Sequence, residues 1–304
     1  MTSSTDHRPP AVLGRLRMPP GVLAALACTH CGAGLAPAGN ALRCDRGHGF
    51  DVAREGYVSL LSGRRPAGTG DTADMVAARR AFQEAGHYAP LARRISGLAG
   101  EHAGLTGRPP AGGGLVADVG AGTGHYLAGV LADHPGATGL ALDVSKYALR
   151  RAAKAHPRAG AAACDAWQGL PVRDRTASAL LNVFAPRDGA EFHRVLRADG
   201  ALIVAGPTTR HLAELIAALG LVTVDPRKEE RIDRTLGDRF VRTHREELEV
   251  PLLLPHRDIA TAVGMGPSAR HLSAADLAGR IAALPDPAPV TASFLVTVHR
   301  PRPA

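Results

Sequence analysis

Apolar residues form short runs along the last two thirds of the chain, and stretches at helical spacing lie between these runs. The runs comprise residues 115–119, 138–142, 160–164, 177–183 and 201–205, with two further candidates at 240–248 and 292–298. After the first run, Tyr126, Leu127, Val130 and Leu131 fall on one face of a helix. Buried strands about 20 residues apart, joined by helices, predict a mostly parallel, doubly wound α/β sheet over 115–304.

The first third of the chain is organised differently. Residues 1–21 are polar and proline-rich, which predicts a disordered extension. Residues 22–61 form a compact unit that holds three of the four cysteines. Residues 62–114 combine Gly- and Pro-rich breaks with one stretch at helical spacing, Met75 to Leu98, so we expect a linker and a helical segment there.

Four potential metal ligands lie in the compact unit. Cys28 and Cys31 are separated by two residues, and Cys44 follows after twelve more, with His48 four positions beyond it. The pattern C-x2-C-x12-C-x3-H is typical of a closed, structural zinc site that staples a segment too small to have its own core. The alternative, scattered core cysteines beside a surface histidine, accounts less well for this spacing. Cys164, which ends a predicted strand, is expected to be a buried thiol.

Cysteine content and hydropathy narrow the class of protein. Four cysteines in 304 residues exclude a disulfide scaffold and favour a reducing compartment, so we expect a cytoplasmic protein. The apolar stretch from Val22 to Cys28 is too short for a secretory signal. Because no apolar run reaches the length of a membrane helix, we expect no membrane partner.

The net charge of +8 comes almost wholly from arginine, and residues 1–110 hold 13 basic and 8 acidic side chains. Arginine forks onto phosphates and stacks on bases, so the excess suggests a polyanionic partner such as RNA. A GC-rich genome would also enrich arginine, so the charge alone does not establish RNA binding. Candidates for phosphate contacts are Arg43, Arg46, Arg54, Arg64, Arg65, Arg79 and Arg80.

A glycine loop follows the first predicted strand. Gly120, Gly122 and Gly124 turn the strand into a helix beginning near His125, so the backbone can approach a ligand closely. A dinucleotide fingerprint needs its third glycine at position 125, which is histidine. The G-x-G-x-G form with Asp118 two residues upstream is instead typical of S-adenosylmethionine sites.

Two more aspartates end predicted strands. Asp143 lies 19 residues after Gly124, where a carboxylate can accept hydrogen bonds from both ribose hydroxyls. Asp165 ends the next strand and is placed to accept from an adenine amino group. Each aspartate could instead be the N-cap of the helix that follows it; Asp143, for example, comes shortly before Ser145, where a helix could begin.

The fourth strand ends in Asn182-Val-Phe184-Ala-Pro186. Carboxyl ends of strands are where such sheets place chemistry, and an Asn followed by an aromatic ring could hold a planar base by hydrogen bonding and stacking. Equally, Asn182 could cap the strand and Phe184 could belong to the core.

Together these motifs resemble the 23S ribosomal RNA (guanine-N1)-methyltransferases, and most closely the branch that confers resistance to tylosin-type macrolides. The resemblance covers about residues 22–300. It rests on CTHC, CDRGHGFDVAREGYVSLL, DTADMVAARRAFQEAGHYAPL, VADVGAGTGH, ALDVSKYALRRAAKAHPRA and LNVFAPR. The segment GHGFDVAREGYVSLL is specific to the family, whereas the glycine loop is generic.

The resemblance implies a zinc-binding domain that recognises an RNA hairpin, a class I methyltransferase domain that uses S-adenosylmethionine, and usually a homodimer. It implies methyl transfer to N1 of one guanine in a domain II hairpin loop of 23S rRNA near the peptide exit tunnel.

By position, the resemblance also assigns three groups of residues. The zinc ligands would be Cys28, Cys31, Cys44 and His48. The methyl donor would be held by Asp118, Gly120, Gly122, Gly124, Asp143 and Asp165, with His87 and Tyr88 either closing over it or packing at a helix end. The target base would be bordered by Asn182, Phe184 and Pro186. Arg270 stands where relatives are expected to have tryptophan, and its guanidinium can partly replace that aromatic by stacking.

Two other functions remain open at this point. A small-molecule methyltransferase of antibiotic biosynthesis would need neither a zinc knuckle nor a basic N-terminal third. A non-catalytic zinc-ribbon RNA-binding protein would not need the intact glycine loop and its aspartates.

Overall fold

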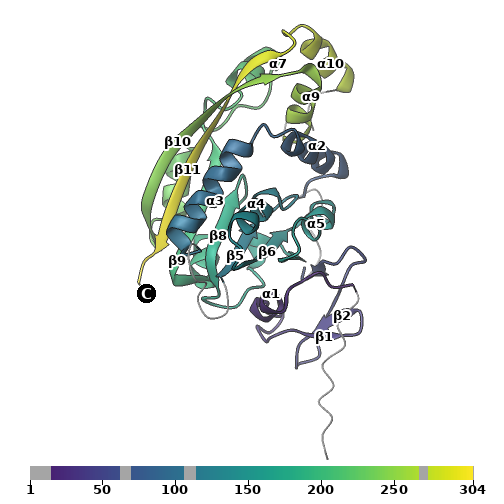
Figure 1. The fold of residues 1–304 in the computed structure, drawn as a ribbon, viewed down its shortest axis with the longest axis vertical. Coiled ribbons are helices and arrows are strands. Elements are labelled where there is room, and N and C mark those ends of the chain that lie inside the picture. Colours follow the sequence, from purple (N-terminus) through teal and green to yellow (C-terminus); the bar gives the residue numbers. More distant parts are fainter. Residues whose placement is uncertain (1–14, 62–69, 106–113, 267–272, 304) are drawn as a thin grey trace, which may run out of the picture.

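The structure, a computed structural model, describes residues 15–61, 70–105, 114–266 and 273–303. An eight-stranded sheet runs through it in the order β10-β11-β9-β8-β5-β6-β7-β4 (Figure 1). Its strands are β4 (Val58–Ser59), β5 (Gly114–Val119), β6 (Ala137–Asp143), β7 (Ala159–Ala163), β8 (Ala177–Val183), β9 (Leu196–Pro207), β10 (Phe240–Leu254) and β11 (Ala288–Pro301). The strands from β4 to β9 pair in parallel, and β11 pairs antiparallel with both β9 and β10.

The central strands are buried on both faces because their residues are almost all apolar. In β9, Ala201, Ile203 and Ala205 pack into the core on one face, while Leu202 and Val204 pack into the core on the other. This two-sided burial is typical of parallel sheets covered by helices.

Helices cover both faces of the sheet. One face packs against α3 (Ala89–Ala103), α4 (His125–Asp133) and α5 (Lys146–Ala152). The other packs against α1 (Pro20–Ala25), α6 (Gly189–Val195) and α8 (Lys228–Leu236). The remaining helices are α2 (Ala73–Glu84), the short 3-10 helix η1 (Ala166–Gln168), α7 (Ala213–Leu219), α9 (His256–Gly264) and α10 (Ala274–Ala282). The predicted α/β class with a mostly parallel, doubly wound sheet is confirmed.

The cysteine-containing unit, called the zinc module below (residues 22–61), lies at one end of the long axis of the molecule (Figure 1). It contains a small antiparallel sheet of β1 (Ala36–Ala38), β2 (Ala41–Arg43) and β3 (Gly49–Asp51). Leu26 of the module bridges to Val172, and β4 pairs in parallel with β7. The module therefore adds the edge strand of the main sheet, although the sequence predicts that this sheet begins at 115.

The predicted helical stretch from Met75 to Leu98 is two helices. The first, α2, ends at Glu84, and α3 begins at Ala89. Gly86 lies between them with φ +82°, a left-handed conformation that favours glycine and that a continuous helix does not contain. The turn lets α2 leave the sheet face and lie beside α9 at the carboxyl edge of the sheet.

The structure describes only part of the predicted N-terminal extension, residues 1–21. Residues 1–14 lie outside the described range, and within 15–21 the first helix already begins at Pro20. In the part of the chain that the structure describes, no helix is both long and apolar enough to cross a membrane.

Candidate functional site

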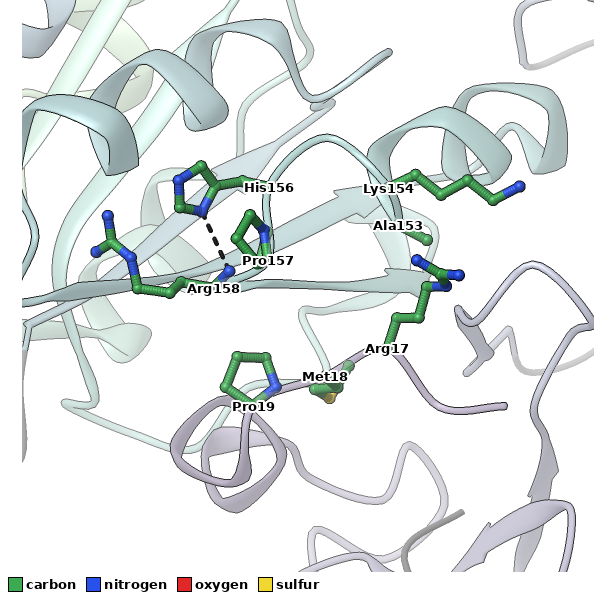
Figure 2. Close-up of a pocket in the computed structure, with 9 residues that line it drawn as sticks. Arg17, Met18, Pro19, Ala153, Lys154, His156, Pro157 and Arg158 are labelled. Atoms are coloured by element: carbon green, nitrogen blue, oxygen red, sulfur yellow. Dashed lines mark hydrogen bonds between the residues drawn. The ribbon is translucent and has the colours of Figure 1, made fainter. Parts of the chain in front are cut away.

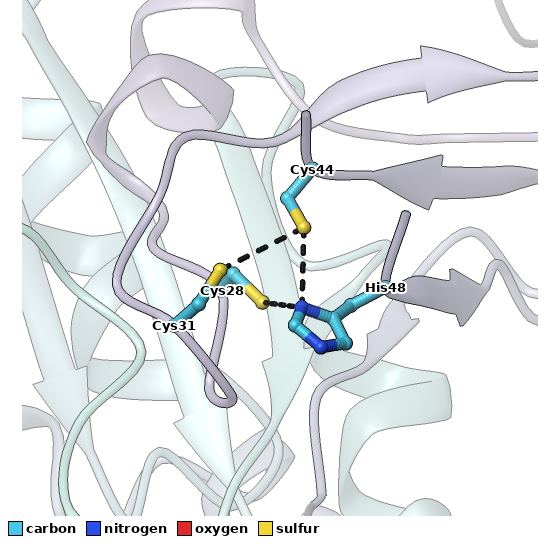
Figure 3. A group of neighbouring side chains, drawn as sticks. All are labelled: Cys28, Cys31, Cys44 and His48. Carbon is cyan, nitrogen blue, oxygen red and sulfur yellow. Dashed lines mark hydrogen bonds between the residues drawn. The ribbon is translucent and has the colours of Figure 1, made fainter. Parts of the chain in front are cut away.

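Four ligand side chains of the zinc module converge (Figure 3). Cys28 and Cys31 lie on the turn after α1, closed by a hydrogen bond from Gly32 N to Cys28 O (2.8 Å). Cys44 and His48 lie on the connection between β2 and β3, closed by Cys44 N donating to His48 O (3.1 Å). The structure thus brings together all four predicted ligands, with their ligand atoms within 4.8 Å of one another.

The spacing of these atoms fits a zinc ion. Sγ of Cys31 lies 3.7 Å from Sγ of Cys44, and Nδ1 of His48 lies 3.6 Å from Sγ of Cys28 and 3.3 Å from Sγ of Cys44. Zinc–sulfur bonds of about 2.3 Å in a tetrahedron place neighbouring ligand atoms about 3.8 Å apart. Because four protein ligands complete the coordination sphere, such an ion stabilises the module and leaves no position for substrate.

His30 and Cys164 are not part of this group of four side chains. His30 is exposed and stacks on Phe50, with ring centroids 5.7 Å apart. Cys164 is buried at the end of β7, and burial raises the pKa of its thiol. The thiol is therefore the inert, buried group that the sequence predicts.

The glycine loop lies at the carboxyl edge of the sheet. Backbone N–H groups of Gly120 and Ala121 both donate to Leu142 O, at 2.8 and 3.0 Å. A Cβ atom at Gly120 would lie 2.4 Å from Cβ of Ala185, and its φ of +75° favours glycine. Only glycine therefore lets this loop approach the turn that follows β8.

A cavity of about 490 Å³ opens at this edge. It extends from the glycine loop past the turn after β8 to the segment between α7 and α8 and to the end of α9. Among the predicted site residues, those that line it are Asp118, Gly120, Gly122, Tyr88 and Phe184. Donor-binding and base-binding candidates thus share one cavity.

Asp118 is the most unusual group of the cavity. Its side chain is 1% exposed, and Oδ2 has no hydrogen-bond partner among the described residues. Burial, with a further contribution from the charge of Asp143, raises the pKa of Asp118 to about 8. A buried carboxyl that faces a cavity without a partner is suited to a ligand that donates a hydrogen bond or carries positive charge.

Two other residues that were predicted to hold the methyl donor, Asp143 and Gly124, do not line the cavity. The carboxylate of Asp143 accepts from Gly122 N (2.9 Å) and from Ser145 N (2.7 Å), so it holds the glycine loop in place. Gly124 does not line the cavity. A Cβ there would lie 2.9 Å from Cβ of Ala155, so Gly124 allows close packing between α4 and the end of α5.

Asp165 and His87 also lie outside the cavity lining. Asp165 caps η1, accepting from Trp167 N at 3.0 Å. His87 pairs with Asp258 of α9, with Nε2 and Oδ2 2.9 Å apart, and so fastens the turn between α2 and α3 to α9. For both residues, the structure shows the capping or packing alternative that the sequence left open.

Hydrogen bonds of the Asn182 side chain stabilise the turn after β8. Nδ2 of the fully buried Asn182 donates to Pro186 O (2.8 Å), and its Oδ1 accepts from Nε of Arg187 (3.1 Å). The amide is thus used inside the turn and is not directed at a base, and Pro186 does not line the cavity. Phe184 adopts φ +55° at the tip of the turn and is 41% exposed, so it presents its ring to the cavity.

An aromatic wall surrounds the ring of Phe184. Tyr88, Tyr126 and His211 have ring centroids 6.3, 6.4 and 6.3 Å from it. Nε2 of His211 lies 3.0 Å from the hydroxyl of Tyr88, while its Nδ1 accepts from Ser293 N (3.2 Å). Burial lowers the pKa of His211 to about 4. The imidazole is therefore neutral, with its lone pair already in use.

Sequence reasoning missed several groups of the cavity. Arg79, predicted to contact RNA phosphate, lines the cavity instead; it pairs with Asp71 and donates to Met265 O (3.0 Å). His211 and Lys228 lie in segments with no recognisable motif. Arg79 lies in DTADMVAARRAF, part of a segment on which the family resemblance rests, and this could have indicated a place at the site. For His211 and Lys228, only the folded chain shows that they line the cavity.

A second hollow of about 610 Å³ lies between residues 17–19, which precede the zinc module, and the connection between α5 and β7 (Figure 2). Arg17 and Lys154 are exposed on it. Arg158 also lines it, but its guanidinium donates to backbone carbonyls, including those of His134 (2.9 Å) and Pro135 (2.7 Å). Two cations are therefore available to an external anion.

A glycine loop after the first strand, a carboxylate ending the second and a cavity across the carboxyl edge of a mostly parallel sheet define a class I methyltransferase site. A family model described as "RlmA, N-terminal", a zinc ribbon, matches residues 26–64. The chain belongs to the 23S rRNA (guanine-N1)-methyltransferase family, as comparison with curated relatives shows.

Two relatives carry this assignment, and a third is similar to part of the chain. A Streptomyces fradiae protein, the 23S rRNA (guanine(748)-N(1))-methyltransferase, is 50% identical over 279 residues, which cover 91% of this chain and 97% of that protein. A Micromonospora griseorubida protein, whose name assigns it to the 23S rRNA (guanine-N(1)-)-methyltransferases, is 50% identical over 299 residues, or 93% of this chain and 100% of that one. A Bacillus subtilis protein with the same kind of name is 35% identical over 198 residues, covering 62% and 66% of the two chains.

Proposed function

We propose that this protein transfers a methyl group from S-adenosylmethionine to N1 of a guanine in a domain II hairpin loop of 23S rRNA near the peptide exit tunnel. Two observations support this together. Members of this family match the chain over nearly its whole length, and a single cavity is lined by both the glycine loop and the exposed ring of Phe184. A small-molecule substrate would leave the zinc module without a part in recognition.

The residues at the carboxyl edge fit the methyl donor. S-adenosylmethionine supplies a methyl group on a positively charged sulfur and carries an amino group as well. The unpartnered carboxyl of Asp118 is available to the cationic portion of the donor, and the loop of Gly120 and Gly122 offers backbone at close range. Asp143 keeps that loop in place.

The aromatic wall suits a base removed from its stack. A guanine that leaves the hairpin loop loses stacking worth a few kcal/mol, and stacking on the ring of Phe184 would offset part of that loss. Because in-line methyl transfer depends chiefly on alignment, a base held flat beside the glycine loop is already positioned for reaction.

The zinc module and α5 offer cations for the phosphate backbone. Arg43 and Arg46 are exposed on the module, and Arg17 and Lys154 face the hollow of Figure 2. Arg54 is 89% exposed, with only a 3.7 Å contact to Glu55. Neutralising phosphates with such side chains supplies affinity that does not depend on sequence.

Three other residues were predicted to contact phosphate. Arg80 pairs with Glu84 on the exposed side of α2. Arg64 and Arg65 lie outside the described residues, as does Arg270.

A homodimer, a cytoplasmic location and resistance to a tylosin-type macrolide complete the proposal. The family resemblance implies the dimer and the resistance, and a ribosomal RNA substrate implies the cytoplasm.

Primer extension on 23S rRNA from cells expressing the protein tests this proposal. A methyl group on N1 blocks base pairing, so reverse transcription stops at the modified guanine. We expect one new stop in domain II that Asp143→Ala abolishes and that Asp238→Ala, a change of an exposed aspartate on the loop before β10, retains. Absence of any new stop with the wild-type protein contradicts the proposal.

A further inference from the structure

Lys228 is a half-buried lysine that lines the cavity. It begins α8, and it lies against the carboxyl end of β9. A Cβ atom at Gly206 would lie 3.2 Å from Cε and 3.4 Å from Nζ of Lys228, so the end of the lysine side chain lies close to the backbone of β9 at Gly206.

This edge is also where the base-binding turn is anchored. Phe184 N donates to Ala205 O (2.9 Å), and Ala205 is the neighbour of Gly206 in β9. Lys228 and Phe184 thus both line the cavity, and both contact the carboxyl end of β9, through Gly206 and Ala205.

The charges around Lys228 disfavour its protonated form. Arg187, from the turn after β8, and Arg231, one turn further along α8, both act on it with positive charge. Asp225 is the acidic group that faces it, but that carboxylate is paired with Arg231 at 3.0 Å. The neutral imidazole of His211 supplies no countercharge.

No ion pair or hydrogen bond of the Nζ atom is found among the described residues, and burial, with the two arginines, lowers the pKa of Lys228 to about 8. With such a pKa, about one amine in ten is neutral at pH 7 and about half are neutral at pH 8, and a neutral amine is a proton acceptor.

Several other titratable groups of the cavity are less suited to accept a proton from a base. His211 has its lone pair occupied by Ser293 N–H. Arg79 and Arg231 are permanently protonated. Burial raises the pKa of Tyr88 and Tyr126, so both keep their protons.

We propose that Lys228 is the general base that removes the N1 proton of the target guanine, an inference that rests on the proposed function. The neutral Nζ accepts the proton as the N1–H bond breaks. The electron pair of N1 forms the new N–CH3 bond while the S–CH3 bond breaks, and its electrons stay on sulfur. The positive charge of the sulfonium is thereby replaced by that of the lysine ammonium, so atoms and charge balance.

Single-turnover methylation of 23S rRNA, measured from pH 6 to 9 at saturating donor, tests the assignment. For Lys228→Ala we expect a loss of about 10²- to 10⁴-fold in the rate constant. We also expect that added alkylamines restore part of this rate, and more so the more basic the amine. The wild-type rate should rise with pH and level off near 8, and this rise should be absent in Lys228→Ala.

Two further variants separate base catalysis from charge. Lys228→Arg keeps a cation that cannot accept a proton, so we expect it to be as slow as Lys228→Ala. Arg234→Ala removes an exposed charge from the same helix and should react like the wild type. Calorimetric binding of the donor to each variant shows that the cavity is intact.

The outcomes are distinct. If Lys228→Arg reacts at the wild-type rate, or if amines do not rescue Lys228→Ala, Lys228 is not the base and the proposed function stands. If the wild-type protein does not methylate a guanine, the proposed function fails and the role of Lys228 fails with it.

Discussion

The carboxylate of Asp143, at the end of β6, accepts a hydrogen bond from the backbone N–H of Gly122, in the loop after β5, at 2.9 Å. Its other oxygen accepts from Ser145 N at 2.7 Å. Burial raises the pKa of Asp143, and these two donors counteract that by favouring the ionised form. One side chain thus fixes two neighbouring strand ends at the site where the donor is expected to bind.

Replacing this carboxylate should weaken donor binding. In Asp143→Ala, two buried N–H groups lose their acceptor, at a cost of about 1–3 kcal/mol each, and the loop is free to move. We expect the dissociation constant for S-adenosylmethionine, measured by isothermal titration calorimetry, to rise at least about tenfold. Asp143→Asn keeps one acceptor oxygen and should lose less. Equal affinity in Asp143→Ala and wild type would show that the loop does not depend on this contact.

Zinc should stabilise more than the module that binds it. We expect about one zinc per chain by elemental analysis, and none in Cys44→Ser. Because α1 packs on β6 and β7 and β4 pairs with β7, loss of the metal should lower the unfolding temperature of the main sheet as well. Cys164→Ser, which changes the buried thiol away from the cluster, should retain the zinc. A metal-free Cys44→Ser protein that unfolds at the wild-type temperature would contradict this coupling.

Asp118 should make the stability of the ligand-free protein depend on pH. Its pKa is raised to about 8 in the folded state, whereas an unfolded chain has an aspartate pKa of about 3.9. Between these values the folded state holds one more proton, so stability falls as pH rises, by up to about 1.4 kcal/mol per pH unit.

Urea unfolding of wild type and Asp118→Asn between pH 5 and 8 measures this effect. The difference between the two isolates the contribution of Asp118 from that of the histidines. We expect the wild-type protein to lose stability relative to the variant across this window. A constant difference would mean that Asp118 is ionised throughout.

RNA binding should respond to salt through the zinc module. Each phosphate contact that is removed lowers the slope of log K against log salt by about 0.7 to 0.9. We expect the double change Arg43→Ala and Arg46→Ala to flatten the slope by up to about 1.8, measured with a 23S rRNA hairpin by filter binding. Arg197→Ala, at the start of β9 and at the opposite end of that strand from the cavity, should leave it unchanged. An unaltered slope in the double variant removes these arginines from the interface.

Elements whose pattern is local could be predicted from the sequence. β8 was predicted with its observed bounds, because six of its seven residues are apolar or small and the whole strand is buried, and the zinc ligands followed from spacing alone. By contrast, the pairing of β4 with β7 depends on how the zinc module docks. Since β4 has only two residues, it is too short to show a periodicity from which a strand could be predicted.

The candidate site divides in the same way. The glycine loop and Asp118 have a motif, and the structure places them on the cavity. Lys228 and His211 reach it from segments that follow the last parallel strand, where only the long antiparallel pair of β10 and β11 and the packing of α9 decide the position. For Asn182 the sequence left base contact and capping open, and in the structure its amide hydrogen-bonds within the turn, donating to Pro186 O and accepting from Arg187.

The central claim is that the cavity methylates N1 of a guanine in 23S rRNA. Its most direct test uses purified protein, unmodified 23S rRNA and S-adenosylmethionine with a labelled methyl group, followed by nucleoside analysis of the RNA. We expect label in 1-methylguanosine alone, at about one per rRNA molecule. Label in another nucleoside, or no label in the RNA, would contradict it.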